Sequence, residues 1–247
     1  MDLVRVYRSI QAFPKYGWDY LRFRKAYRKT FQKRLRFYPC LLDYTAASGV
    51  ASGHYFHQDL WVAQQIFLAS PERHIDVGSR VDGFVAHVAS FRTIEVIDIR
   101  PQTSHVRNIE FLQGNLSDEG FQLEAAPDSL SCLHALEHFG LGRYGDPIDP
   151  EGHQKAFANM HRLLRAGGIF YFSVPIGVAR VEFNAHRVFG LDELEEMFRG
   201  RFSVEHFAVV DDAGELFTDL PWTSPERCRW FDLNYGCGIF VLRKQND

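Results

Sequence analysis

Short apolar segments alternate with amphipathic segments between residues 54 and 200 of this 247-residue chain. Apolar runs of strand length predict buried strands, and apolar residues spaced three and four apart predict helices. Strands separated by helices form a parallel sheet covered on both faces, because each helical crossover returns the chain to the same end of the sheet. The predicted strands span 74–78, 93–100, 109–115, 129–136 and 168–175, and the predicted helices span 59–69, 82–91, 150–166 and 191–200.

The last part of the chain departs from this alternation. Residues 202–210 and 235–244 both predict strands, with no convincing helix between them. An antiparallel pair at the sheet edge is the simplest arrangement for two such strands. The expected fold class is therefore α/β, with a doubly wound, mostly parallel, Rossmann-like sheet and an antiparallel C-terminal strand pair. Asp59 is the expected cap of one helix, and Asp149 with Pro150 the expected start of another.

A basic segment precedes the α/β region. Residues 1–41 contain 11 Lys/Arg against 2 Asp/Glu, although the whole chain has a net charge of −3. Apolar residues recur in it at helical spacing, which predicts an amphipathic helix ended by Pro39. We therefore expect a basic helical extension and linker over residues 1–53 and an α/β domain over residues 54–247. The apolar stripe of the helix consists of Tyr20, Phe23, Tyr27, Phe31 and Leu35.

The basic helix has two interpretations. Its aromatic stripe can dock on the acidic body of the protein, or its Lys/Arg can contact an anionic membrane surface, nucleic acid or a phosphorylated substrate. We expect no nucleic-acid partner, because the chain lacks a target-base motif such as N-P-P-[YF] and its acidic body offers no evident groove for a phosphate backbone. Docking, peripheral membrane contact and binding of the substrate all stay open.

Composition excludes several classes of protein. A hydrophobic fraction of 46% supplies ample core, so disorder is excluded. No apolar run approaches the ~20 residues of a membrane-spanning helix, and the N-terminus shows no apolar secretory region. The cysteines form no C-x-x-C pair and suit small buried thiols of a reduced, cytoplasmic protein better than a disulfide or zinc framework. They are Cys40, Cys132, Cys228 and Cys237.

Polar residues follow the predicted strands at their carboxyl ends. Ligands of open α/β sheets bind beyond these ends, so residues there are candidates for a shared site. One such residue is expected by chance, but a series on successive strands is harder to explain structurally. The series is Asp76 and Gly78 at the first strand, Asp98 at the second, Asn115 and Leu116 at the third, and His134, Glu137 and His138 at the fourth.

The loop after the first strand, DVGSRVDGF, distinguishes between cofactors. Gly78 and Gly83 have the spacing of the outer glycines of G-x-G-x-x-G, but Arg80 replaces the middle one. In a dinucleotide site the middle glycine lets the backbone approach the pyrophosphate, so Arg80 disfavours NAD and FAD. S-adenosylmethionine carries no phosphate, and its ammonium and carboxylate suit Asp76 and the Ser79–Arg80 segment.

The order DVGS…VIDIRP…QGNL…LHALEHF…LLRAGGIFYFSVP resembles class I S-adenosylmethionine-dependent methyltransferases over roughly residues 54–245. Four shorter stretches look like an uncharacterised bacterial branch of that superfamily, a domain family of unknown function associated with surface-polysaccharide biosynthesis. These stretches are HYFHQDLWVA, DVGSRVDGF, SLSCLHALEHFGLGRYGDP and FNAHRVF.

The resemblance implies roles for several residues of the strand-end series. Asp76 and Gly78 match the first motif of the superfamily, Asp98 matches its ribose-binding acid, and Asn115 matches the position that contacts adenine. The chain departs from the superfamily at Arg80, where glycine is common, and at Asn115, where aspartate is common. The residues assigned to S-adenosylmethionine are Asp76, Gly78, Ser79, Arg80, Gly83, Asp98, Asn115, Leu116 and His134.

Methyl transfer to a hydroxyl needs positioning and a general base. His138 is the first choice of base, because an imidazole pKa of ~6.5 suits proton removal near neutrality. Glu137 is expected to orient that imidazole or to contact the cofactor, and His186 is a further catalytic candidate. Structural roles for these residues stay open alternatives. The expected substrate-binding residues are Arg143, Tyr144, Asn184 and Arg187.

The predicted function is S-adenosylmethionine-dependent O-methylation of a small-molecule or saccharide-type acceptor. A catalytically inactive binding module of the same fold and a nicotinamide-dependent oxidoreductase are the alternatives. No metal is assigned: Asp149 and Glu151 are accounted for by the start of a helix, and proximity in sequence does not show that oxygen ligands converge. The group considered for Mg²⁺ is Asp146, Asp149, Glu151 and His153.

Overall fold

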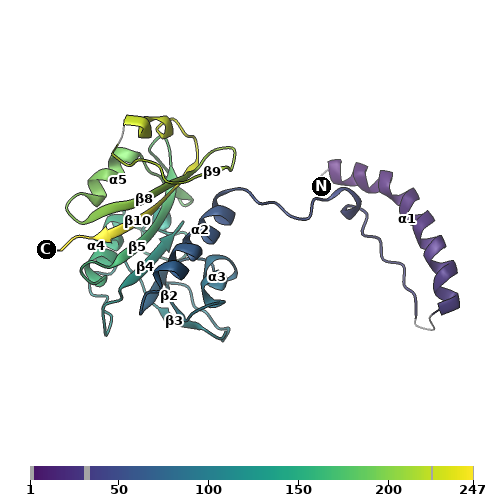
Figure 1. Ribbon diagram of the computed structural model, residues 1–247, viewed down its shortest axis with the longest axis horizontal. Coiled ribbons are helices and arrows are strands. Elements are labelled where there is room, and N and C mark those ends of the chain that lie inside the picture. The colour runs from purple at the N-terminus through teal and green to yellow at the C-terminus, as the bar shows by residue number, and fades with distance from the viewer. Residues whose placement is uncertain (1–2, 31–33, 224, 247) are drawn as a thin grey trace. The chain divides into compact units, whose positions relative to one another are not determined.

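The computed structural model describes residues 3–30, 34–223 and 225–246. The chain divides into two compact units between Val50 and Ala51, which are described separately. Figure 1 labels the elements of both units.

The second unit is built on an eight-stranded sheet in the order β3-β2-β1-β4-β5-β10-β8-β9. Strands β1 to β5 are parallel, and β10 runs antiparallel to both β5 and β8. The expected doubly wound sheet with an antiparallel C-terminal pair is therefore confirmed. The strands are β1 (His74–Val77), β2 (Ile94–Asp98), β3 (Ile109–Gln113), β4 (Ser129–Leu133), β5 (Ile169–Ile176), β8 (Phe202–Val210), β9 (Leu216–Phe217) and β10 (Gly236–Lys244).

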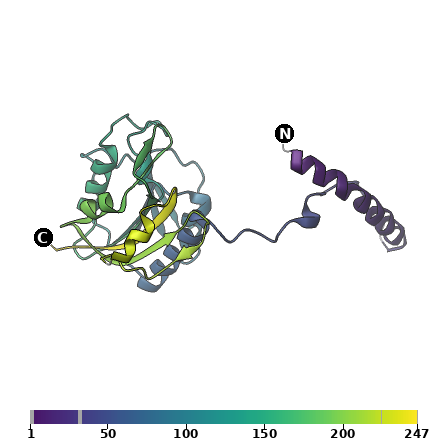
Figure 2. The same cartoon turned by 90° about the horizontal axis from the view of Figure 1, so that it is seen from above.

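Helices cover both faces of the sheet, as Figures 1 and 2 show from two directions. On one face, α4 (Gly152–Leu163) and α5 (Leu191–Phe198) contribute Phe157 and Phe198 to an aromatic core. On the other, α2 (His54–Ala69) and α3 (Ala86–Ala89) enclose a smaller core. Apolar side chains on both faces explain why β1 and β4 are buried along their whole length.

Three helix starts differ from the sequence-based expectation. Helix α2 begins at His54 after Gly53, so Asp59 lies inside the helix and is buried rather than capping it. A wide turn (η2, Val81–Val85) replaces the first half of the predicted 82–91 helix. Helix α4 begins at Gly152, although the Asp149 carboxylate does accept a hydrogen bond from the Glu151 amide just before it.

A small hairpin, formed by β6 (Arg180–Glu182) and β7 (His186–Val188), was not predicted. The segment alternates too briefly to stand out from a polar turn. Asn184 lies in its turn with φ +62°, a conformation that asparagine tolerates better than most residues. The remaining short helical turns are η1 (Asp43–Thr45), η3 (Leu136–His138) and η4 (Pro225–Trp230).

The first unit contains one long helix, α1 (Leu3–Thr30), which continues through Pro14. The helix starts and ends earlier than its apolar stripe predicts: residues 34–41 are not helical, and Phe31 lies outside the described residues. Instead the chain turns back, and Phe37 packs edge-on against Tyr16 and Tyr20. None of the described helices is long and apolar enough to cross a membrane.

Candidate functional site

The carboxyl ends of β3, β2, β1 and β4 adjoin in that order, and one pocket lies beyond them. The chain reverses its direction of winding between β1 and β4, which is where open α/β sheets bind their ligands. Most of the predicted strand-end series lines this pocket, together with the glycine-rich loop that follows β4. The predicted residues in the lining are Gly78, Arg80, Asp98, Asn115, Leu116, His134, His138, Arg143 and Tyr144.

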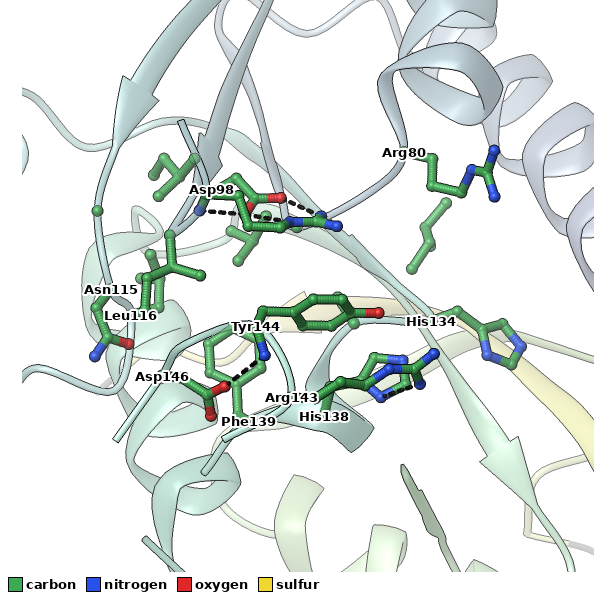
Figure 3. A pocket seen from close by; sticks show the side chains of 18 of the residues that line it. Arg80, Asp98, Asn115, Leu116, His134, His138, Phe139, Arg143, Tyr144 and Asp146 are labelled. Carbon is green, nitrogen blue, oxygen red and sulfur yellow. Dashed lines mark hydrogen bonds and ion pairs between the residues drawn. The ribbon is translucent and has the colours of Figure 1, made fainter. Parts of the chain in front are cut away.

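The strand order spreads these residues along the pocket. In Figure 3, Asn115 and Leu116 lie at one end, Arg80 and His134 lie at the other, and Asp98 lies between them. A ligand that spans the pocket therefore meets an amide at one end, a carboxylate in the middle, and arginine and histidine at the far end.

In the loop after β1, the backbone of Gly78 lies close to the side chain of Ala135. Gly78 has φ +75°, and a Cβ at this position would lie 2.9 Å from the Cβ of Ala135. Both facts require glycine here. Asp76, in contrast, does not line the pocket: its buried carboxylate accepts hydrogen bonds from the Ser79 amide and from the hydroxyls of Ser79 and Ser131. Asp76 and Ser79 thus hold the loop rather than a ligand.

Asp98 faces the pocket but already has a partner. Arg100 donates three hydrogen bonds to it, one from its amide and two from its guanidinium. A carboxylate offers about four lone-pair sites, so one stays available to a ligand hydroxyl. At the neighbouring strand end, Asn115 accepts from the Ser117 amide through its side-chain oxygen. Its amide nitrogen has no hydrogen-bond acceptor among the residues that the structure describes, so it can donate to a ligand.

The other two predicted residues of the loop after β1, Arg80 and Gly83, have different positions: Arg80 lies at the edge of the pocket, and Gly83 packs against a helix. The Arg80 guanidinium is exposed and pairs with Asp82 at 2.7 Å, so it lies at the rim of the pocket. Gly83 does not line the pocket; a Cβ there would lie 2.9 Å from the Asp59 carboxylate of α2. The assignment of Gly83 to the cofactor is therefore replaced by a packing role, which lets the loop approach α2.

The glycine-rich loop after β4 is fixed by its own hydrogen bonds. Asp146 accepts from the amides of Gly140, Gly142 and Tyr144, which closes the loop on itself. Gly140 has φ +77°, and a Cβ there would lie 1.9 Å from the Asp149 carbonyl oxygen. The loop therefore has a fixed conformation and forms one side of the pocket. The carboxylates of Asp146 and Asp149 both accept hydrogen bonds from nearby backbone amides, and Asp149 also forms an ion pair with Lys155.

His138 and His134 share one buried carboxylate. Glu137 Oε1 lies 2.9 Å from His134 Nδ1 and 3.6 Å from His138 Nε2. His138 Nδ1 lies 2.6 Å from the Ala185 carbonyl oxygen, which can only accept, so this nitrogen carries the proton and Nε2 has the free lone pair. Burial lowers the pKa of His138 from 6.5, opposed by the Glu137 charge. The imidazole is therefore neutral at pH 7.

Three guanidinium groups are among the residues that line the pocket. Those of Arg100 and Arg143 lie 4.5 and 5.2 Å from the centre of the Tyr144 ring, and Arg80 lies at the end near His134. Tyr144 also contacts the His138 ring edge-on at 5.5 Å. An aromatic surface with cations beside it suits a planar or saccharide ligand that carries negative charge.

The three predicted residues of the β6–β7 hairpin also lie outside the pocket lining. Arg187 is buried and donates to the carbonyls of Glu137, Phe139 and Pro150, so it supports the glycine-rich loop rather than a substrate. His186 lies 3.2 Å from Glu182 and against Tyr235, and Asn184 forms the hairpin turn.

Arg100 and Phe139 are among the lining residues that sequence reasoning did not single out. Arg100 stands two positions after Asp98, so the spacing of an Arg next to a strand-end acid was a usable signal. Tyr55, in the HYFH stretch that we expect from the sequence to be able to close over the cofactor, lines the pocket from the start of α2.

The fold and the position of this pocket define the Rossmann-like class of methyltransferase folds. Within that class, a family model described as "Caenorhabditis protein of unknown function, DUF268" matches residues 83–235, more than half of the chain, and the chain belongs to this family. None of the curated proteins matches the chain.

Solved structures of methyltransferases have the same fold. N-methyltransferase NodS from Bradyrhizobium japonicum WM9, in complex with S-adenosyl-L-homocysteine, is 14% identical with a TM-score of 0.52, over 78% of this chain and 89% of that one. A putative sarcosine dimethylglycine methyltransferase from Galdieria sulphuraria is 14% identical, with a TM-score of 0.53 over 76% and 86%. The [4+2]-cyclase SpnF is 15% identical, with a TM-score of 0.52 over 77% and 82%.

Proposed function

We propose that this protein is an S-adenosylmethionine-dependent methyltransferase that acts on a small-molecule or saccharide-type acceptor. The observation that carries the proposal is the strand-end series, which lines one pocket at the point where the winding of the sheet reverses. The similarity to structures of methyltransferases, including one with bound S-adenosylhomocysteine, supports the same cofactor here.

The order of groups along the pocket matches the order of groups in the cofactor. Asn115 and Leu116 offer an amide and an apolar surface to adenine, and the remaining lone pair of Asp98 suits one ribose hydroxyl. The Gly78 backbone and Arg80 lie where the amino-acid end would follow, and Arg80 can bind its carboxylate. Asp76 is too enclosed to bind the ammonium directly, so its role is to hold the loop that does.

O-methylation of the acceptor fits the position of His138. An acceptor oxygen would displace S-adenosylhomocysteine from the methyl group, while its proton passes to the free lone pair of His138 Nε2. The Glu137 carboxylate at 3.6 Å would stabilise the imidazolium that forms. Arg143 and Tyr144 are the proposed contacts of the acceptor, and their charge and ring favour an anionic sugar or a similar small molecule.

Calorimetry with S-adenosylhomocysteine tests the cofactor assignment. We expect Asp98→Ala to weaken binding by about 1–3 kcal/mol, the scale of a lost hydrogen bond to a charged group. Glu110→Ala is the matched control, because Glu110 is an exposed acid on β3 outside the pocket lining. Binding of NADH without any response to S-adenosylhomocysteine would overturn the proposal.

A binding module without catalysis is the second candidate, because the fold also occurs in a protein described as a [4+2]-cyclase and therefore does not by itself imply methyl transfer. Labelled S-adenosylmethionine incubated with pooled nucleotide sugars, glycans and small metabolites distinguishes the two. Transfer of label to an acceptor supports the enzyme, whereas tight cofactor binding with no transfer across the pool supports the module. The four cysteines are free thiols, which supports the cytoplasm as the compartment in which such a search should begin.

A further inference from the structure

Beside the pocket, residues from three distant parts of the chain bring metal-ligand atoms together. His54 at the start of α2, His134 after β4 and Cys237 in β10 each place one such atom within 4.8 Å of the other two. Two imidazoles and a thiolate are a ligand set typical of zinc. Cys237 and His134 are buried, so the cluster lies in the protein interior and not on its surface.

Both histidines are oriented as metal ligands commonly are. His134 Nδ1 lies 2.9 Å from the Glu137 carboxylate, while its Nε2 is buried and has no hydrogen-bond partner among the described residues. The His54 ring lies between the rings of His134 and Tyr235, with centroids 5.1 and 5.3 Å away, which fixes its position beside the other two side chains. Metal-binding histidines characteristically bond one ring nitrogen to a carboxylate or a carbonyl and offer the other to the metal.

The sulfur of Cys237 interacts with the His134 side chain and makes only long contacts with oxygen atoms. Its contacts with the Gln58 side-chain oxygen and the Gly238 carbonyl are both 3.8 Å long, near the outer limit for sulfur. The Gln58 oxygen is already bonded to Ser173 at 2.6 Å, so it does not depend on the thiol. Loss of the thiol proton to a metal therefore disrupts little.

We propose that His54, His134 and Cys237 form a zinc site with a fourth position open toward the pocket. Structural zinc sites have four protein ligands, whereas three ligands leave a position for water or substrate. His134 itself lines the pocket, so that position adjoins the bound ligand. Binding releases the Cys237 proton, and the charges of the thiolate and of Glu137 together balance Zn²⁺.

This site stands apart from the proposed methyl transfer, because metal binding is measured without cofactor or acceptor. The test uses the untagged full chain carrying Cys40→Ser and Cys228→Ser, which removes the two exposed thiols. Titration with Zn²⁺ against a competing indicator should give one equivalent with a Kd below about 1 μM. Cys237→Ser and His54→Gln should each weaken binding by at least about 100-fold, and Glu137→Gln by about 10–100-fold.

Controls separate the site from surface binding and from misfolding. His206→Gln, in an exposed histidine of β8, should leave zinc affinity unchanged. Co²⁺ in place of Zn²⁺ should give a thiolate-to-cobalt absorption band that disappears in Cys237→Ser, and the melting temperature of each metal-free variant checks that it folds. Folded His54→Gln and Cys237→Ser proteins that bind zinc like the parent would overturn the site, as would a parent that binds none. Loss of S-adenosylhomocysteine binding alone would instead overturn only the proposed function.

Discussion

His138 combines three properties of a general base: it lines the pocket, its Nδ1 proton is held by the Ala185 carbonyl, and its Nε2 lone pair is free. A positioned base contributes about 10²–10⁴-fold to rate. We expect His138→Ala to lower turnover by that factor, while calorimetry finds S-adenosylhomocysteine binding near normal. Normal turnover would make His138 a bystander, and joint loss of turnover and binding would make it a cofactor contact.

The pH dependence of turnover gives a second test of the same residue. Burial lowers the pKa of His138 from 6.5, and the base acts only when it is deprotonated. Activity should therefore be full at neutral pH and fall as the pH drops through a pKa below 6.5. An ascending limb above pH 7, or a limb that persists in His138→Ala, would assign the proton transfer to another group.

Arg143 and Arg187 lie near the same loop, but their substitution should affect the stability of the protein differently. Arg187 is buried, and its guanidinium satisfies three backbone carbonyls. Arg187→Met should therefore lower the free energy of unfolding by about 2–4 kcal/mol, measured by denaturant titration. Arg143 is exposed, and Arg143→Met should leave stability within about 0.5 kcal/mol of the parent. Equal stability of the two variants would contradict the supporting role of Arg187.

At the scale of secondary structure, the sequence predicted most strands of the sheet correctly but did not predict where their side chains point. The strands that contain Asp76 and Asp98 were predicted because a strand buried on both faces is apolar throughout. The direction of a side chain at a strand end is set by neighbours distant in sequence. Ser131, 55 positions away, binds the Asp76 carboxylate, and no local pattern predicts this contact.

Contacts between segments distant in sequence also explain why the start of helix α2 and the cluster of His54, His134 and Cys237 were not predicted. Helix α2 starts at His54, whose ring packs on His134 and Tyr235, rather than at the acid best suited to cap it. The zinc-ligand cluster was missed for the same reason. Its three residues have no metal-site spacing in sequence. Cys237 lies near His134 because β10 pairs with β5, which pairs with β4, and His54 reaches them from the first turn of α2.

The N-terminal helix α1 belongs to a unit of its own, and its role is still a prediction. Every residue of the pocket lies between positions 55 and 146. Deletion of residues 1–50 should therefore leave S-adenosylhomocysteine affinity unchanged. If the aromatic stripe docks on the second unit, the same deletion should lower the melting temperature by exposing apolar surface. An unchanged melting temperature with loss of binding to anionic vesicles would assign the helix to a membrane surface instead.

Across the whole molecule, a buried polar network connects the sheet to the ligand loop. His74 contacts the hydroxyls of Ser129 and Ser131, and the Ser131 hydroxyl donates to Asp76, which in turn holds Ser79. Burial disfavours charge on both titratable members. It lowers the pKa of His74 from 6.5 to about 3 and raises the pKa of Asp76 from 3.8 to about 6.

These two shifts have opposite effects on stability. Between pH 6.5 and about 3 the unfolded chain binds a proton at His74 that the folded protein does not, so this residue lowers stability as the pH falls. Between pH 6 and 3.8 the folded protein binds the proton at Asp76, so that residue raises stability as the pH falls. The pKa of His74 is shifted further from its ordinary value than the pKa of Asp76 is. The effect of His74 therefore outweighs that of Asp76, and the two residues together lower the stability of the protein in acid.

We expect His74→Gln and Asp76→Asn to change the acid dependence of stability in opposite directions. Unfolding free energies of the ligand-free protein, measured with a chelator at pH 7, 6, 5 and 4, give the slope. His74→Gln should lose less stability than the parent over this range, and Asp76→Asn should lose more, each by at most about 1.4 kcal/mol per pH unit. Parallel curves for the parent and both variants would mean that the pKa of neither group differs between the folded and the unfolded protein, so that burial of this network does not account for the acid dependence of stability.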